Sequence, residues 1–224
     1  MTCVGLKARL QQRLDPVSAW SPERAAVRSD YDLNPDFSRP KVKLRPAAVL
    51  IPIIAREDGP SVLLTRRSDS LASHTGQIAF AGGRLDPGET ALDAALREAW
   101  EEIALDPAVV EPLGLGDPYE TGTGFLVTPV VGWLTAPPDV TPSPAEVAEV
   151  FEAPWDFLMD PVNHRRDYYD QENGPRRWFW AMPYRERYIW GVTAGILKGL
   201  FNRLYGEEAA PHQAAEADAT ERVE

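Results

Sequence analysis

Three glutamates within one short segment carry the residue types and spacing for metal chemistry. The stretch ALREAWEEIAL, residues 95–105, contains Glu98, Glu101 and Glu102. At about 100° per residue these three positions fall on one face of a helix. They fit the solvated face of an amphipathic helix, where clustered acids are common. They equally fit a set of carboxylates that holds a divalent cation, because Mg²⁺ prefers oxygen ligands. The spacing alone leaves both interpretations open.

The residues around the glutamates favour a metal site. Glu98 and Glu102 form a like-charged i, i+4 pair, which costs a few tenths of a kcal/mol, and we expect no basic residue on that face. The preceding loop, residues 82–89, contains three glycines and a proline. Because glycine lets backbone approach a ligand closely, the carbonyl of Gly82 is expected to join the carboxylates in an all-oxygen site suited to Mg²⁺ or Mn²⁺. A pair between Arg97 and Glu89 would hold the loop against the helix.

The elements that must position these groups follow from local pattern. Thr90 and Asp93 resemble a capping box, so the helix is predicted to begin near Thr90. An apolar stripe is expected to face the core, at Leu92, Leu96, Ala99 and Ile103. The other predicted elements are a helix over 4–14, a hairpin of strands 46–54 and 61–67, a strand over 77–80, a strand pair within 109–135, a strand and short helix within 143–158, a hairpin around Asn173-Gly174 within 165–184, and a closing amphipathic helix over 190–205.

The chain divides by composition into three parts. Residues 1–45 are predicted to be an N-terminal helix and an extended lead-in, and residues 46–205 one mixed α/β domain. Residues 206–224 form an acidic tail without large apolar side chains, which we expect to be disordered. With 44% hydrophobic residues in 224, the chain has ample material for a packed core.

Charge and cysteine usage restrict the class of protein. The net charge is −11; the tail has six acids and one base, contributing −5 and leaving −6 on the rest. This balance disfavours nucleic acids as partners, and an acidic protein that handles phosphates needs a mediating cation. The single cysteine excludes an internal disulfide and suits a reducing compartment. No signal peptide or long apolar run is evident, so we expect a soluble, cytoplasmic protein that binds no membrane. Its oligomeric state stays open.

The spacing around the glutamates resembles the Nudix box. Gly83, five residues, Glu89, seven residues and then REAWEEIAL from Arg97 reproduce its pattern over 23 residues. Ala104 stands where the box has glycine, and we expect it to change how the helix ends. The resemblance implies a Nudix α/β/α sandwich, with a mixed sheet between helices, and hydrolysis of a nucleoside diphosphate linked to another moiety.

The same resemblance assigns roles. Glu98 and Glu102 are implied as first metal ligands, with Glu101 close behind, and Arg97 and Glu89 belong to the same catalytic motif. The general base is left open among the three glutamates and a carboxylate outside the box.

The segment ahead of the box, residues 63–86, resembles the signature of the coenzyme A pyrophosphatase branch. The matches are Leu63-Leu64-Thr65, Arg67-Ser68, Gly76-Gln77, Phe80 and Gly82-Gly83, with Ala81 in place of a proline that would fix the loop. This implies cleavage of coenzyme A or its thioesters to 3′,5′-ADP and 4′-phosphopantetheine or its acyl form. The alternatives are another Nudix substrate (ADP-ribose, a dinucleotide or a nucleoside triphosphate) and a protein that only binds ligand. The second usually loses box carboxylates, and here none is missing.

The substrate phosphates require local cations. Arg66 and Arg67 are the candidates, the alternative for each being a surface arginine or an ion pair with Asp69. Gln77 is expected either to contact substrate or to brace the loop.

Three further groups have two interpretations each. His74 fits a phosphate contact or, preferably, a structural role. The run Trp178-Phe179-Trp180 fits base stacking or, preferably, strand packing with alternate residues toward the core. Glu146 or Glu149 would supply a late carboxylate or simply lie on an exposed turn.

Overall fold

A mixed sheet forms the centre of the molecule. The computed structural model describes residues 2–39, 42–69, 75–171 and 174–206, and this sheet has nine strands among them. They are β1 (Arg28–Ser29), β2 (Arg45–Ile54), β3 (Ser61–Arg67), β4 (Ile78–Ala79), β5 (Gly82–Arg84), β6 (Glu111–Leu115), β7 (Tyr119–Glu120), β8 (Phe125–Leu134) and β9 (Val147–Pro154). β2 and β8 run parallel over ten residue pairs, whereas β3 pairs antiparallel with β2, β4 and β9.

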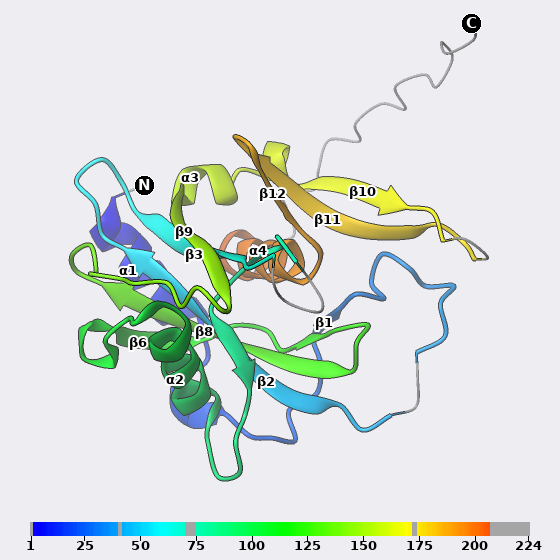
Figure 1. Ribbon diagram of the computed structural model, residues 1–224, viewed down its shortest axis with the longest axis horizontal. Coiled ribbons are helices and arrows are strands. Elements are labelled where there is room, and N and C mark those ends of the chain that lie inside the picture. The colour runs from blue at the N-terminus through cyan, green and yellow to red at the C-terminus, as the bar shows by residue number, and fades with distance from the viewer. Residues whose placement is uncertain (1, 40–41, 70–74, 172–173, 207–224) are drawn as a thin grey trace, which may run out of the picture.

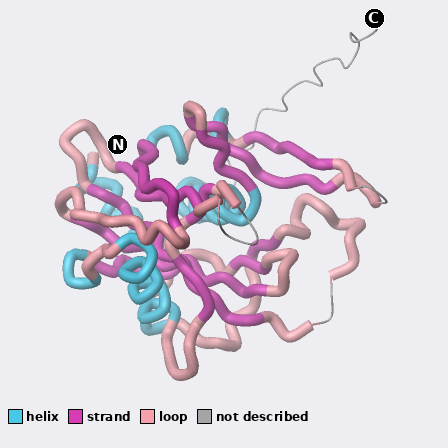
Figure 2. The backbone as a smooth tube through the Cα atoms, in the orientation of Figure 1, coloured by secondary structure: helices cyan, strands magenta, loops and turns pink. Residues whose placement is uncertain are grey.

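The two faces of β2 separate two hydrophobic cores. Successive side chains of a strand point to opposite faces, so Ile51 and Ile53 join one cluster while Leu50 and Ile54 join the other. The first cluster includes side chains of α1 (Cys3–Arg13) and α4 (Gly191–Tyr205), and the second includes those of α2 (Ala91–Ile103). Helices therefore cover both sides of the sheet (Figures 1 and 2). The predicted α/β/α sandwich is confirmed.

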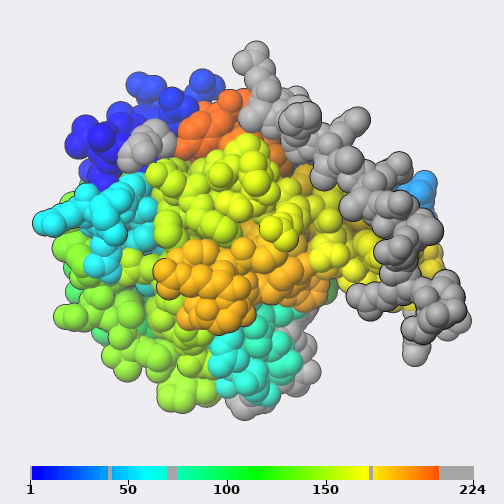
Figure 3. Space-filling view, turned by 90° about the horizontal axis from the view of Figure 1, so that it is seen from above, coloured from blue at the N-terminus to red at the C-terminus, as the bar shows by residue number. Residues whose placement is uncertain are grey.

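A small second sheet lies over α4. It consists of the antiparallel strands β10 (Arg165–Tyr169), β11 (Arg177–Tyr184) and β12 (Arg187–Trp190). The short helix α3 (Trp155–Leu158) and the 3₁₀ turn Pro161–Asn163 connect it to β9, and two further 3₁₀ turns span Val17–Ala19 and Pro107–Val109. Figure 3 shows the β11–β12 turn packed beside the segment that follows residue 74.

One prediction about helix faces is confirmed only in part, since Ala99 and Ile103 of the expected α2 stripe are buried and Leu92 and Leu96 are not fully so, and a second, for the helix over 190–205, is wrong. The buried face of α2 is made mainly of alanines, Ala91, Ala94, Ala95 and Ala99, whereas Leu92 and Leu96 are only partly buried. The stripe is therefore rotated, because short side chains let the helix lie close to β2 and β5. The helix over 190–205 is not amphipathic, since every residue from Thr193 to Phe201 is buried. It is enclosed because it lies between the main sheet and the small sheet.

Most other predicted elements are present, with small differences at their ends. The hairpin of β2 and β3 forms through Ile53–Val62 and Ile54–Ser61, and the strand pair within 109–135 appears as β6, β7 and β8. The loop after Phe80 contains an unpredicted strand, β5, that pairs with β2. The predicted tail lies outside the described residues from position 207 onward. None of the described helices is long and apolar enough to cross a bilayer.

Candidate active site

Helix α2 begins and ends at well-defined residues. Thr90 is the N-cap and forms a reciprocal capping box with Asp93, as predicted. At the other end Ala104 adopts the left-handed conformation, with φ 53° and ψ 31°. This is the conformation that usually selects glycine. The difference at this position therefore places a strained alanine at the end of the helix.

Arg97 fastens the glycine-rich loop to the helix. Its Nε donates to Glu89 at 2.7 Å and its Nη2 donates to the other Glu89 oxygen and to the Arg84 carbonyl, each at 3.0 Å. The predicted Arg97–Glu89 pair is confirmed. Nη1 also reaches Glu98 at 3.0 Å and Glu101 at 3.2 Å. The expectation of no basic residue on the glutamate face is therefore wrong, because the long side chain of Arg97 extends over it.

The three glutamates differ in exposure. Glu102 is buried, with 4% of the residue exposed, while the side chain of Glu98 is 17% exposed and that of Glu101 is 53% exposed. Glu98 lies against Gly83, where an added Cβ would overlap its carboxylate. The loop glycine therefore makes room for a functional side chain. A solvated face does not account for an arrangement in which two of its three acids are withdrawn from water.

Burial and like charges perturb two of these carboxyls. Burial, followed by the charges of Glu98 and Glu146, raises the pKa of Glu102 to about 8, against opposing contributions from the Gly82 N–H and Arg67. Burial likewise raises the pKa of Glu98. A cation among these groups would lower both pKa values, because opposite charge favours the ionised form.

The donor set fits a hard divalent cation. Glu98 and Glu102 supply oxygens one helical turn apart, and Gly82 and Gly83 bring backbone next to them. Across the described ranges, no three His, Cys, Asp or Glu side chains are already gathered in ligating geometry. Glu98 and Glu101 are instead both paired with Arg97. Gly82 presents its N–H, rather than its carbonyl, to Glu102.

Comparison with known proteins decides the family. A profile described as NUDIX domain matches residues 44–172. The chain is 44% identical over 172 residues to "Uncharacterized Nudix hydrolase NudL" of Enterobacter sp. (strain 638), covering 75% of this chain and 87% of that protein. It is 43% identical over 173 residues, with the same coverage, to the protein of that name in Escherichia coli (strain K12). The chain belongs to the Nudix family.

This Nudix chain is an enzyme, a pyrophosphohydrolase that acts on a nucleoside diphosphate derivative. Hydrolases of the family generally depend on a divalent metal. Among solved structures, the binary complex of a C. elegans Ap4A hydrolase is similar with a TM-score of 0.44 and 21% identity, covering 52% of this chain and 83% of that one.

The two candidate arginines of the Nudix domain lie in different places. Arg66 makes ion pairs with Asp69 at 3.3 Å and Glu149 at 3.7 Å and lines an open outer cavity. Arg67 faces inward, where its charge acts on Glu102 and its buried Nε has no hydrogen-bond partner among the described residues. Arg67 and Gln77 line a cavity of about 470 Å³ that reaches Gly82, and Gln77 also borders the outer cavity. Arg66 therefore forms the alternative ion pair with Asp69, whereas Arg67 forms no such pair among the described residues.

The two candidate carboxylates outside the box, Glu146 and Glu149, also lie in different surroundings. Glu146 is exposed and lies near enough to raise the pKa of both Glu98 and Glu102. Glu149 pairs with Arg187 and Arg66 instead. Glu146 is therefore the better candidate for a carboxylate outside the box. His74 lies outside the described residues.

The cavity wall contains residues that sequence reasoning missed. The lead-in contributes Asp30 and Leu33, and β11 contributes Arg177. No local pattern marks these positions, because the fold brings them together from distant segments. The prediction that alternate residues of the run Trp178-Phe179-Trp180 face the core holds only in part. Trp180 packs against the main core, yet Trp178, Phe179 and Trp180 all line the cavity.

Proposed function

We propose that this Nudix hydrolase cleaves the diphosphate of coenzyme A or of its thioesters. The products are 3′,5′-ADP and 4′-phosphopantetheine or its acyl form. The observation that carries the proposal is that Arg67, Gln77, Phe80 and Gly82, all residues of the coenzyme A pyrophosphatase-like segment, line one cavity beside Glu102. Its volume, about 470 Å³, lies within the range of small-molecule sites, about 300–1,000 Å³.

The reaction is a displacement at phosphorus. A water oxygen joins one phosphorus of the diphosphate, the bond from that phosphorus to the bridging oxygen breaks, and the bridging oxygen leaves on the other phosphate. Negative charge grows on the leaving oxygen in the transition state, so cationic groups accelerate the step. Arg67 is the proposed contact for a phosphate oxygen, supported by its position in the cavity wall and by a buried Nε that has no partner in the described part of the chain.

Mg²⁺ or Mn²⁺ would be held by Glu98 and Glu102, with Glu101 and the Gly82 backbone as further candidates. Bound there, the cation supplies charge neutralisation and lowers the pKa of an attached water. Arg97 and Glu89 keep the loop and the helix in register. Glu98, Glu101, Glu102 and Glu146 are the candidates for accepting the proton from water, and the proposal does not choose among them.

Product identification by mass spectrometry tests this function. The protein is incubated separately with coenzyme A, ADP-ribose, NADH and a deoxynucleoside triphosphate, with Mg²⁺, with Mn²⁺ and with chelator. We expect 3′,5′-ADP and phosphopantetheine from coenzyme A only when metal is present, with the other compounds slower. Preferred cleavage of another compound would reject the coenzyme A assignment while retaining the Nudix chemistry. No product from any compound would favour a protein that only binds its ligand.

A further inference from the structure

Part of the cavity wall comes from outside the segment that matches the Nudix profile. The profile covers residues 44–172, yet the lead-in around Asp30 and the strands β11 and β12 also line the cavity. These segments lie next to one another because the lead-in passes beside the small sheet (Figure 1). A ligand in the cavity would therefore touch residues that the common Nudix domain does not supply.

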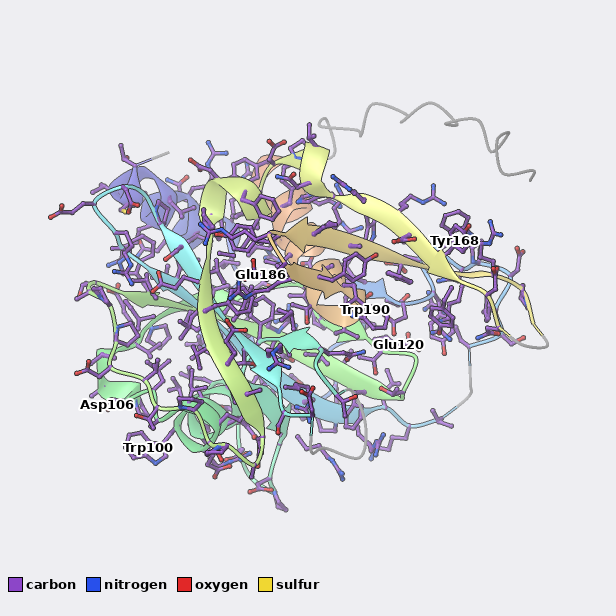
Figure 4. All side chains as sticks on the ribbon, turned by 45° about the horizontal axis from the view of Figure 1, so that its top comes forward. Trp100, Asp106, Glu120, Tyr168, Glu186 and Trp190 are labelled. Carbon is purple, nitrogen blue, oxygen red and sulfur yellow. The ribbon has the colours of Figure 1, made fainter. Side chains whose placement is uncertain are left out.

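One face of the small sheet presents two aromatic rings to the cavity, Phe179 and Trp190, tilted 58° to one another. Arg177 and Phe179 are two residues apart on β11, so their side chains leave the same face of the strand. The rings of Phe179 and Trp190 pack with centroids 5.0 Å apart, and both residues are partly exposed and line the cavity. Figure 4 shows Trp190 inward of the β10–β11 hairpin and Tyr168 on its outer side. A planar heterocycle can stack on one of these rings and meet the other by its edge, because bases stack on aromatic side chains and tilted aromatic pairs are favourable.

Arg177 places a positive charge beside that surface. It lies against Gly122, where an added Cβ would overlap its Nη2. Its Cζ is 5.9 Å from the ring centroid of Tyr31 and 5.5 Å from that of Phe37. Within the described ranges it makes no ion pair with a carboxylate. Asp30, the acid next to it, already accepts from the Tyr119 hydroxyl at 2.9 Å and from the Gly122 N–H at 2.7 Å. A guanidinium with no carboxylate of the described residues within ion-pair distance, beside an Asp30 already engaged in two hydrogen bonds, is suited to binding an anion.

Asn34 fixes the lead-in to β11 at this point. Its Nδ2 donates to the carbonyls of Trp178 and Asp30, each at 2.8 Å, and its Oδ1 accepts from the Trp178 N–H at 2.8 Å. The residue is buried, with 3% exposed. These bonds hold the backbone next to Arg177, which makes Asn34 a positioning residue for the cavity wall.

We propose that this cavity binds the adenine half of the substrate, with the base on Phe179 and Trp190 and the ribose 3′-phosphate on Arg177. This inference rests on the proposed function and names the residues that would distinguish a 3′-phosphorylated nucleotide from one without that group.

Binding without metal tests the inference separately from turnover. Adenosine 3′,5′-bisphosphate and AMP are titrated into the chelator-treated protein by calorimetry, using wild type, Arg177→Gln, Phe179→Leu and the matched control Arg176→Gln. Arg176 is adjacent in sequence, yet it pairs with Asp170 at 3.1 Å and stacks on Tyr168, outside the cavity. Circular dichroism and thermal melting establish that each variant is folded.

We expect Arg177→Gln to weaken the binding of adenosine 3′,5′-bisphosphate by about 10- to 100-fold, the range for a lost charged hydrogen bond. The affinity for AMP should change by no more than about 2-fold. Phe179→Leu should weaken both nucleotides by about 10-fold or more. Arg176→Gln should change neither. Asn34→Asp, which loses the two donated bonds, should raise KM for the cleaved substrate with little change in kcat.

Equal weakening of AMP and the bisphosphate by Arg177→Gln would overturn the 3′-phosphate assignment. Binding of 4′-phosphopantetheine that depends on Phe179, with no binding of either adenine nucleotide, would place the other half of the substrate in the cavity and overturn the inference. If the adenine nucleotides bind as expected while coenzyme A is not cleaved, the proposed function fails and the nucleotide site stands.

Discussion

At the scale of single residues, the site depends on how unlike the three glutamates of α2 are. The sequence presents them as equivalent members of one helix face. In the structure Glu102 is buried beside Gly82, Glu98 rests on Gly83, and Glu101 is held at the surface by Arg97. Their types and spacing were readable because helix geometry is local. Their burial was not, because it is set by β5 and by the loop that covers one side of the helix.

Glu102→Gln should lower the metal-dependent rate by more than about 100-fold, since it exchanges a charged ligand for a neutral amide. The fold should survive, because the pKa of about 8 means that the metal-free protein already holds this group largely protonated at neutral pH. Steady-state rates and thermal melting of Glu102→Gln and Glu101→Gln measure the difference, and the exposed Glu101 should be the less sensitive. A Glu102→Gln enzyme with the wild-type rate would refute the assignment of Glu102 as a ligand.

At the scale of elements, the limits of α2 were predictable and its orientation was not. The Thr90–Asp93 capping box was readable in the local sequence, whereas Ala104 was expected to change the helix end and instead adopts the left-handed conformation typical of glycine. The buried stripe was misjudged because large apolar residues were taken to mark the core, whereas alanines allow the closest approach to the sheet. Leu92 and Leu96 pack only at the edge of that core. The prediction for α4 failed for a related reason, because nothing near residues 190–205 reveals that a second sheet covers it.

Ala104→Gly should stabilise the protein by about 0.5–1 kcal/mol, because Ala104 has φ 53° and glycine adopts this conformation without a Cβ penalty. The free energy of unfolding in urea measures the effect. Ala94→Gly, in the interior of the same helix, should instead destabilise by about 1 kcal/mol or more. A loss of stability in Ala104→Gly as large as that in Ala94→Gly would show that the backbone at Ala104 is not strained.

At the scale of the whole molecule, the cavity is a product of long-range pairing. Residues near positions 30, 67, 80, 177 and 190 meet around it, and only the middle positions belong to a recognisable motif. The mixed sheet and the sandwich could be predicted from the Nudix box, since its 23 residues are specific enough to imply the fold of the family. The lead-in and the small sheet could not be placed, because the bonds from Asn34 to β11 join residues 144 apart.

The packing of the small sheet and α3 around α4 also predicts how stability depends on pH. His164 is 6% exposed, lies edge-on to Phe201 on α4, and its Nε2 bonds to the Leu158 carbonyl at 2.7 Å. Burial lowers its pKa, and the nearby charge of Lys198 acts in the same direction, while the bond to Leu158 opposes the shift. With a folded pKa below the unfolded value, the contribution of neutral His164 is complete above about pH 6.5 and is lost as the pH falls toward the folded pKa.

The free energy of unfolding should therefore fall between pH 7 and pH 5, with this one group contributing a slope of at most about 1.4 kcal/mol per pH unit. In His164→Gln the fall should be smaller. Lys198→Met removes the like charge and so raises the folded pKa of His164 toward its unfolded value. The loss of stability on acidification should therefore be smaller in this variant at each pH. Urea titrations at half-unit pH steps measure these slopes. Among the described residues, His164 is the histidine that α3, the small sheet and α4 together keep from water. Parallel curves of unfolding free energy against pH for wild type and both variants would therefore show that a different group controls acid stability.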